Sequence, residues 1–366
     1  MASDRPKSPK GHGPKWPGPK SQGPNVQGPN VQDPRLPDPQ EQNSQELGPD
    51  GKKPILNQSL EQLAEYSRKK LGIETLVEEL SGLSTIGIGG PAVVIRVKND
   101  QELMKVVTFH AREGLGLGVI GGGSNVLFPD GGLLAAVVRL DGDFKELAVT
   151  GNFVSAGAGT PVGLILEAGQ ENGLTGLEFL AGLPGTVGGA VMGNAGSKSQ
   201  GLAELIEKME LITPLGENLT LRREEIYPVY RSLNLPESLC GSIVKRVTLA
   251  LRPSNKDLVA KKIAEERKAR REGQPIGRSL GCVFKNPQGQ SAGRLIDLCG
   301  LKGQAQGGAQ ISQKHANFIL NIKRAKASDV LALAKLARSE VLAKHRIKLL
   351  TEIKIWDEMA REVGLS

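Results

Sequence analysis

Glycine is concentrated in three clusters between residues 85 and 190, and these clusters constrain the fold more than any other feature of the chain. They are Thr85–Ala92 (TIGIGGPA), Gly121–Val126 (GGGSNV) and Pro184–Ala190 (PGTVGGA). Because glycine has no Cβ, backbone N–H groups in such loops can approach a phosphate closely and surround it. One cluster alone is typical of a tight turn between strands. Three together favour a long, phosphate-bearing cofactor that lies along several loops.

The common nucleotide-binding motifs do not explain these clusters. Residues 116–121 (GLGVIG) match the GxGxxG pattern, but that motif needs a strand before it and a helix after it. A helix is predicted over residues 100–113, and Pro129-Asp130-Gly131-Gly132 leaves no room for a helix after the motif. No glycine loop ends in Gly-Lys-Ser/Thr either, so the sequence argues against both a classical Rossmann site and a P-loop.

The net charge of +8 does not indicate a nucleic-acid partner. The densest basic stretch, residues 256–273, interleaves its charges in i,i+4 pairs such as Asp257/Lys261 and Glu266/Arg270, as on a solvated helix. It contains no aromatic residues on which bases could stack. A basic balance also suits a small anionic substrate.

The first 54 residues differ in composition from the rest of the chain. They hold 12 of the 22 prolines and a loose five-residue repeat that begins GPKWP, GPKSQ, GPNVQ. Such a segment cannot bury enough apolar surface to fold, so we expect a disordered tail that serves as a linker or as a docking arm for a partner.

The remaining composition indicates a cytoplasmic protein without membrane insertion. The chain has no run of 18 apolar residues and no apolar segment near its N-terminus that would resemble a signal peptide. Its three cysteines form no CxxC motif, so we expect neither a metal site nor a disulfide framework.

Helices and strands alternate without strict βαβ regularity, which predicts an α+β fold. The clearest helices are expected over 58–71, over 100–113 with Asp100 as its cap and Gly114 as its stop, and from Ser328, its expected N-cap, to about Lys344. Strands are expected over 91–97, 209–213 and 244–251, near 282–285, and over 347–356.

Several longer motifs resemble the UDP-N-acetylenolpyruvoylglucosamine reductase (MurB) family. In family order they are TIGIGGPA, GGGSNVLF, GLEFLAGLPGTVGGAVMGNAG, YRSLN, GCVFKNPQGQSAGRLID, GLKG, GGAQISQKHANFILN and LLTEIKIW. The resemblance covers roughly residues 72–357. Only 51 positions separate Arg231 from Cys282, and Tyr230 is the last tyrosine. The chain therefore looks like the shorter branch of the family, which lacks extra substrate-covering elements.

The resemblance implies an FAD-binding fold of the vanillyl-alcohol oxidase and p-cresol methylhydroxylase type. It places FAD-binding subdomain 1 at residues 55–142, FAD-binding subdomain 2 at 143–252 and a substrate-binding domain at 253–366. It further implies a cytoplasmic flavoenzyme of peptidoglycan precursor synthesis, and hence of cell-wall biogenesis, cell shape and cell division. Such an enzyme reduces the enolpyruvyl ether of UDP-N-acetylglucosamine to UDP-N-acetylmuramate, with non-covalent FAD and with NADPH as electron donor.

Three residues match the catalytic positions of the family. Arg231 would hold the substrate carboxylate with its guanidinium fork, and Glu352 would act beside it, as a hydrogen-bond donor if its pKa is raised. Cys282 stands where many members carry the serine that donates a proton. A thiol is mostly protonated at neutral pH, because its ordinary pKa is about 8.5, so it can fill that role.

The resemblance also assigns binding positions. The expected FAD contacts are Thr85, Gly89, Gly90, Gly121, Gly122, Gly123, Ser124, Asn125, Gly185, Thr186, Gly188 and Gly189. Weaker candidates for contact with the UDP-sugar are Tyr230, Ser232, Lys285, Asn286 and His315.

Two other classes compete with the reductase. An FAD oxidase of the same binding fold would explain the glycine clusters, but not the motifs around Arg231, Cys282 and Glu352. A basic scaffold with a Pro-rich arm would bind no flavin and would need none of the motifs after residue 230.

Overall fold

The structure is a computed structural model that describes residues 59–196 and 200–356. The predicted tail at residues 1–54, and any docking partner for it, lie outside the described residues. None of the helices in the described ranges is both long enough and apolar enough to cross a lipid bilayer.

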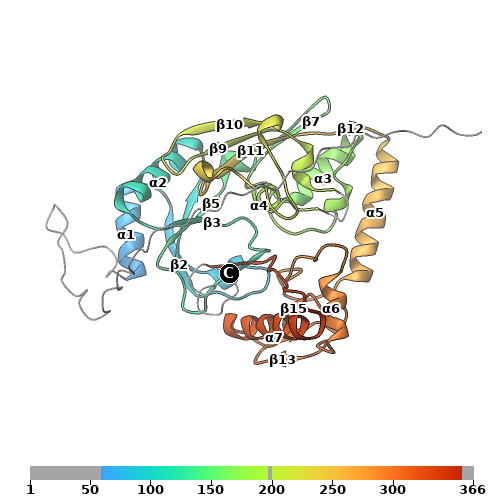
Figure 1. The fold of residues 1–366 in the computed structure, drawn as a ribbon. Coiled ribbons are helices and arrows are strands. Elements are labelled where there is room, and N and C mark those ends of the chain that lie inside the picture. The colour runs from blue at the N-terminus through green and yellow to red at the C-terminus, as the bar shows by residue number, and fades with distance from the viewer. Residues whose placement is uncertain (1–58, 197–199, 357–366) are drawn as a thin grey trace, which may run out of the picture. The chain divides into compact units, whose positions relative to one another are not determined.

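The first sheet carries the segment that leads into the second glycine cluster. Its strands, in spatial order, are β1 (Thr75–Glu79), β2 (Pro91–Val97), β5 (Ala136–Leu140) and β3 (Leu117–Val119). The pair β1/β2 is antiparallel, whereas β2/β5 and β3/β5 are parallel. Strand β2 is buried along nearly its whole length, as its continuous apolar run PAVVIRV predicts. Helices α1 (Leu60–Leu71) and α2 (Asp100–Glu113) pack against this sheet and share its core (Figure 1).

The second sheet is entirely antiparallel. Its strands, in spatial order, are β10 (Asn218–Arg222), β9 (Ile206–Ile212), β11 (Ile243–Ala250), β7 (Phe153–Gly157) and β6 (Leu147–Thr150). Helices α3 (Val162–Glu171) and α4 (Val187–Met192) bury their apolar residues in a core with the inner face of this sheet.

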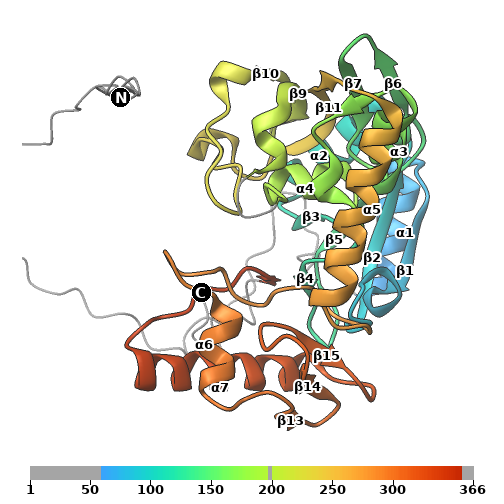
Figure 2. The same cartoon turned by 90° about the vertical axis from the view of Figure 1, so that its right-hand side faces the viewer.

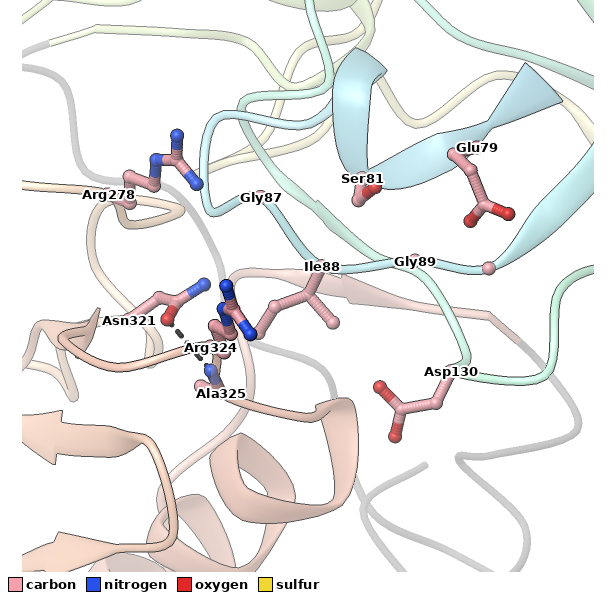
Figure 3. Close-up of a pocket in the computed structure, with 11 residues that line it drawn as sticks. Glu79, Ser81, Gly87, Ile88, Gly89, Asp130, Arg278, Asn321, Arg324 and Ala325 are labelled. Atoms are coloured by element: carbon pink, nitrogen blue, oxygen red, sulfur yellow. Dashed lines mark hydrogen bonds between the residues drawn. The ribbon is translucent and has the colours of Figure 1, made fainter.

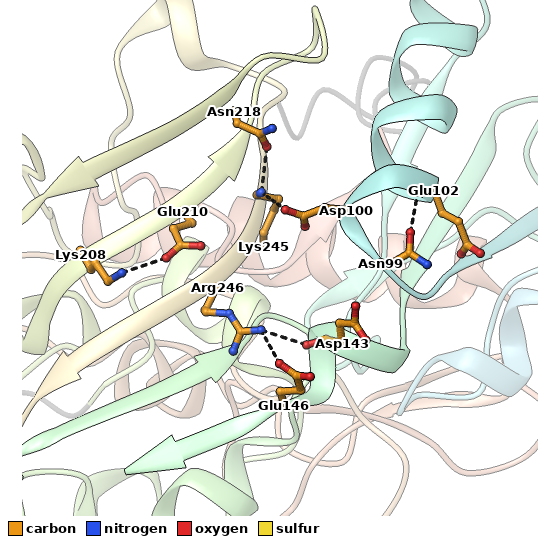
Figure 4. A network of polar contacts seen from close by, with 10 residues as sticks. All are labelled: Asn99, Asp100, Glu102, Asp143, Glu146, Lys208, Glu210, Asn218, Lys245 and Arg246. Carbon is orange, nitrogen blue, oxygen red and sulfur yellow. Dashed lines mark hydrogen bonds and ion pairs between the residues drawn. The ribbon is translucent and has the colours of Figure 1, made fainter. Parts of the chain in front are cut away.

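A polar network joins helix α2 to the second sheet (Figure 4). The ammonium of Lys245 on β11 is almost fully buried and lies 2.5 Å from a carboxylate oxygen of Asp100, at the start of α2. The same ammonium donates a hydrogen bond to Asn218 Oδ1 at 2.8 Å. A buried cation with two oxygen partners fixes the relative position of α2 and the second sheet.

The C-terminal part of the chain begins with helix α5 (Lys256–Gly273), which lies beside α3 and leads down to the segment before α6 (Figures 1 and 2). Helices α6 (Ala292–Leu298) and α7 (Ala327–His345) pack around a three-stranded antiparallel sheet. Its strands are β13 (Ala305–Gln306), β14 (Ala309–Ile311) and β15 (Ile319–Asn321). Two short pairs complete the topology: β8 (Leu174–Thr175) with β12 (Arg252–Pro253), and β4 (Val126–Leu127) with β16 (Lys354–Ile355).

The expected elements are largely present, but four details of the prediction are wrong. The strand expected near 282–285 is not formed, because Cys282 and Phe284 make only isolated bridges, to Phe318 and to Thr351. Helix α2 is capped by Asn99, whose side chain accepts a hydrogen bond from the Glu102 amide, and not by Asp100. Helix α7 begins one residue before Ser328, with Lys326 at the cap position. The stretch 347–356 is mostly irregular, since only Lys354–Ile355 finds a strand partner.

Candidate active site

The loop between β3 and β4, residues 121–125, presents five successive backbone N–H groups. None of them donates a hydrogen bond to another residue within the described ranges. A run of amides without a protein partner can bind an anion such as a phosphate, so residues 121–125 are called the phosphate loop below. The loop's carbonyls, in contrast, are used: Gly123 O accepts hydrogen bonds from the Thr85 amide at 3.0 Å and from Ser84 Oγ at 3.3 Å. The carbonyl contacts hold the loop while its amides stay available for a phosphate.

A second glycine loop, residues 184–186, packs directly on the first. A Cβ at Gly122 would lie only 2.6 Å from Gly185 Cα, and a Cβ at Gly121 would collide with the Thr186 hydroxyl. Ser124 Oγ donates a hydrogen bond to Pro184 O at 3.3 Å. The second and third glycine clusters therefore form one backbone-lined surface, which fits the diphosphate of a long cofactor such as FAD.

The other glycines that were expected to contact the cofactor lie outside this surface or beside it. Gly188 lies in α4, where a Cβ would come 2.8 Å from the Ala158 side chain, so close packing on the residue that follows β7 explains this glycine. Its neighbour Gly189 has only ordinary space around it. Gly89 and Gly90 are packed against Leu80 and against the 130–132 backbone.

Gly89 and Gly90 also border a separate pocket of about 270 Å³, lined by residues 79–90 and Asp130 and by residues of the C-terminal part (Figure 3). Arg278 and Arg324 reach it from the C-terminal side, and Glu79 and Asp130 from the other side. Of the first cluster, only Thr85 contacts the phosphate loop, through its amide, while its hydroxyl donates to Ser279 O at 2.6 Å. Within the first glycine cluster, Thr85 therefore belongs to the surroundings of the phosphate loop, whereas Gly89 and Gly90 belong to the separate pocket.

Arg231 has a left-handed backbone conformation that residues other than glycine rarely adopt. Its φ is +60°, at the corner of a tight turn closed by hydrogen bonds in both directions between Val229 and Ser232. The left-handed conformation costs about 1–2 kcal/mol for such a residue. In exchange, the guanidinium reaches two oxygens from distant segments: Nη1 donates to Gly196 O at 2.9 Å, and Nε lies 3.0 Å from a carboxylate oxygen of Glu352. Strain of this kind is typical of functional sites.

Glu352 is held through its main chain between two other segments of the site. Its amide donates to Val283 O at 2.7 Å, next to Cys282, and its carbonyl accepts from Asn125 Nδ2 at 3.2 Å, in the phosphate loop. Burial raises the pKa of the carboxyl, and the charges of Arg231 and Lys285 partly oppose that rise. The raised pKa makes the protonated, hydrogen-bond-donating form more accessible.

The Cys282 thiol is a protonated group. Burial raises its pKa from 9.0 to about 12, and the nearby Glu352 carboxylate adds to the rise, while Arg231, Asn317 and Arg270 act in the opposite direction. Cys240 is exposed, and Cys299 is buried beside α7. Of the three thiols, Cys282 is the one that lies among the candidate catalytic charges.

Two residues that the sequence analysis did not single out belong to the same site. Asn317 is almost fully buried, and its side-chain amide bonds both backbone groups of Phe284 at 3.0 and 2.8 Å, besides contacting Cys282. Arg270 donates from α5 to Ala181 O at 2.9 Å, just before the 184–186 loop. Neither role leaves a local pattern in the sequence, because both depend on partners that are distant along the chain.

The weaker substrate candidates lie around these residues. The Tyr230 ring lies 5.5 Å from the Arg231 guanidinium and is half exposed, and Lys285 is close enough to lower the pKa of Glu352. Asn286 Oδ1 accepts from the first amide of α6 at 2.9 Å. His315 packs on Gly293 and accepts a hydrogen bond from the Asn317 amide through Nδ1, so a structural role accounts for its contacts.

The fold and this site define a class, and comparisons with known proteins support it. A family model described as an FAD binding domain matches residues 91–222. Together with the free amides of the phosphate loop, this match defines a flavin-dependent oxidoreductase with an α+β FAD-binding fold. A second family model, the C-terminal domain of UDP-N-acetylenolpyruvoylglucosamine reductase, matches residues 274–356.

Named relatives identify the family. A UDP-N-acetylenolpyruvoylglucosamine reductase of Thermus thermophilus is 41% identical over 72% of this chain and 94% of its own length. One from Symbiobacterium thermophilum is 37% identical over 76% of this chain and 91% of its own. The crystal structure of the Thermus caldophilus reductase (MurB) superposes with a TM-score of 0.68 and 39% identity, over 78% of this chain and 99% of that one. The chain belongs to the UDP-N-acetylenolpyruvoylglucosamine reductase family.

Family membership confirms the predicted class of enzyme and its fold, and it removes the non-enzymatic scaffold from consideration. The residues of the phosphate loop fit an FAD-binding role, since five successive amides donate to no described residue and Gly121, Gly122 and Gly123 leave no room for a Cβ.

Proposed function

We propose that this enzyme reduces UDP-N-acetylglucosamine enolpyruvate to UDP-N-acetylmuramate, with NADPH as the electron source. The observation that carries the proposal is the convergence of Arg231, Glu352 and Cys282 next to the phosphate loop. The activity would place the enzyme in peptidoglycan precursor synthesis in the cytoplasm, and hence in cell-wall biogenesis, cell shape and cell division. Bound FAD, held non-covalently, would supply the hydride-transfer chemistry.

The site offers a cation where the reaction develops negative charge. Reduction at the terminal carbon of an enolpyruvyl ether leaves charge that spreads onto the neighbouring carboxylate. The Arg231 guanidinium is already oriented by Gly196 and Glu352, so it can bind that carboxylate without being reorganised. Glu352 in its protonated form can donate a hydrogen bond to the same oxygens. The UDP-sugar is proposed to contact five further residues: Tyr230, Ser232, Lys285, Asn286 and, in addition to its structural contacts, His315.

Cys282 is proposed to complete the reaction as the acid. The second carbon of the former double bond takes the thiol proton, the C–H bond forms with the electron pair of the enolate-like species, and a thiolate remains. Because the thiol pKa is raised, this thiolate is a strong base and recovers a proton from water before the next cycle. The donor is therefore in its acid form throughout the neutral pH range.

The visible spectrum of the purified enzyme tests the proposal. We expect the flavin to bleach when NADPH is added without oxygen and to regain its colour only when the enolpyruvyl UDP-sugar follows. Recovery in air alone would indicate an oxidase. Failure to bind FAD, even after reconstitution, would contradict the proposal as a whole.

Two variants at Cys282 test its role as the acid. Cys282→Ala should be reduced by NADPH like the wild type but should be reoxidised by the enolpyruvyl sugar at least about a hundredfold more slowly, because a general acid typically contributes that much. Cys282→Ser is the matched control and should retain much of the activity. Equal loss of both half-reactions in Cys282→Ala would contradict the assignment.

A further inference from the structure

The C-terminal segment 350–356 links the two halves of the site by main-chain hydrogen bonds. On one side, Lys285 N donates to Leu350 O at 2.8 Å and the Glu352 amide donates to Val283 O. On the other side, β16 pairs in parallel with β4, immediately after the phosphate loop. The segment that carries Glu352 thus lies between the Cys282 segment and the phosphate loop.

Asn125 is the residue through which the phosphate loop holds Glu352. Its side-chain Nδ2 donates to Glu352 O at 3.2 Å, and its own carbonyl accepts from the Lys354 amide at 2.8 Å. Its backbone amide is the last of the five in the phosphate loop that donate to no described residue. Asn125 therefore contacts the catalytic segment with its side chain and carbonyl, while its amide stays available to a ligand of the phosphate loop.

This link is short. The β4/β16 pair contains two residues on each strand, and it is extended beyond its ends by the Asn125–Glu352 bond and by a long contact of 3.4 Å from the Trp356 amide to Leu127 O. Leu127 and Ile353 are also buried in one apolar core, so this packing holds the segment together with the few hydrogen bonds. A ligand that orders the phosphate loop would add to these contacts and shift the population toward the closed arrangement.

We propose that Asn125 is a positioning residue, which makes the placement of Glu352 depend on whether the phosphate loop is filled. A diphosphate on the free amides fixes the loop, the loop fixes the Asn125 side chain, and Asn125 fixes the Glu352 backbone, whose carboxyl meets Arg231. Cofactor loading and assembly of the catalytic carboxylate would then be one event. The catalytic part of this inference rests on the proposed function; the structural coupling does not.

Hydrogen–deuterium exchange of the Glu352 and Lys354 amides tests the coupling without any turnover. The probe is FAD itself, added to full-length protein from which flavin has been removed, with binding followed by absorbance. In the wild type, FAD should slow exchange in the peptide that covers residues 350–356. In Asn125→Leu, which has similar volume but no donor, saturating FAD should give about fivefold less protection, the effect of one neutral hydrogen bond.

Asn321→Leu is the matched control. Asn321 also ties the C-terminal part to the first subdomain, since its Nδ2 donates to Ile86 O at 2.9 Å, but it contacts neither Glu352 nor the phosphate loop. This variant should show wild-type protection of residues 350–356. Equal protection in Asn125→Leu and the wild type, or equal loss in both variants, would overturn the proposal. Asn125→Ser provides a second variant at this position, with a polar side chain. If neither Asn125 variant bound FAD, the residue would serve cofactor binding alone and the proposal would fall.

Half-reactions supply the catalytic readout. In Asn125→Leu loaded with FAD, reoxidation by the enolpyruvyl sugar should be slowed about fivefold more than reduction by NADPH, because only the second step uses Glu352. If wild-type enzyme were not reoxidised by that sugar at all, the proposed function would fail, while the exchange result would still decide whether the coupling exists.

Discussion

The protonation of Cys282 makes a quantitative prediction about its reactivity. A pKa raised from 9.0 to about 12 lowers the thiolate fraction about a thousandfold at any pH well below both values, since each pKa unit is a factor of ten. Only the thiolate attacks an alkylating reagent. We therefore expect iodoacetamide to modify Cys282 about a thousandfold more slowly at pH 8 than it modifies an ordinary free thiol.

Burial could slow the same reaction by blocking access, so the assay uses the pH dependence and not the rate alone. The holoenzyme is treated with iodoacetamide between pH 7 and pH 10, and modification of each cysteine peptide is followed by mass spectrometry. The Cys282 rate should rise about tenfold per pH unit without levelling off, as expected for a group that titrates above the range. The exposed Cys240 shows that the reagent remains active.

Two variants separate the electrostatic causes of the raised pKa. Glu352→Gln removes a negative charge that raises the thiol pKa, so alkylation of Cys282 should become faster. Arg231→Met removes a cation that lowers it, so alkylation should become slower. A plateau below pH 9, or slower alkylation in Glu352→Gln, would refute this account of the thiol and weaken its assignment as the acid.

Three further predictions follow from packing and charge. Gly122→Ala should weaken FAD binding about tenfold or more, as measured by an absorbance titration, because overpacking against the Gly185 backbone costs about 1–3 kcal/mol. An unchanged affinity for FAD would contradict the close approach of the two loops. Arg231→Gly should be about 1 kcal/mol more stable to denaturant than Arg231→Ala, because glycine adopts the left-handed conformation without strain, although neither should reoxidise flavin with substrate. Asp100→Ala should lower the free energy of unfolding by about 2 kcal/mol, because it leaves the buried Lys245 ammonium with one partner. The volume-conserving Lys245→Met should lower the same free energy by less than about 1.5 kcal/mol, because it removes the buried charge itself. Equal losses in the two variants would contradict the reasoning.

Much of the fold could be predicted because its signals are local. Helix α2 ends where Gly114 takes the left-handed conformation, and the apolar run 91–97 forms a buried strand. The proposed domain boundaries at 142/143 and 252/253 remain a prediction, although each of the two large sheets draws its strands from one side of the first boundary. The caps of α2 and α7 were missed by one or two residues because neighbouring polar residues compete for the same role.

The site could be predicted only in part, because half of it is made by contacts that no local pattern records. Motifs identify Arg231, Cys282 and Glu352 as candidates, but Asn125 and Glu352 are 227 positions apart when they meet. The strand expected near 282–285 forms only single bridges, from Cys282 to Phe318 and from Phe284 to Thr351. Such isolated pairs depend on tertiary position and not on alternation of apolar residues.

These isolated bridges are what the chemistry requires. A regular sheet would satisfy every backbone group and direct alternate side chains to opposite faces, so a thiol and a carboxylate on adjacent strands would be paired only by register. Here single bonds from Asn317, Val283 and Asn125 place each segment separately, and an arginine in a strained conformation reaches the carboxylate from a third direction. Each hydrogen bond is weak alone, and beside the apolar core around Val283, Phe284 and Ile353 the proposed coupling would add rigidity through the phosphate loop. A site built in this way would be poorly ordered without its cofactor and well ordered with it, and this is the behaviour that the exchange experiment on residues 350–356 measures.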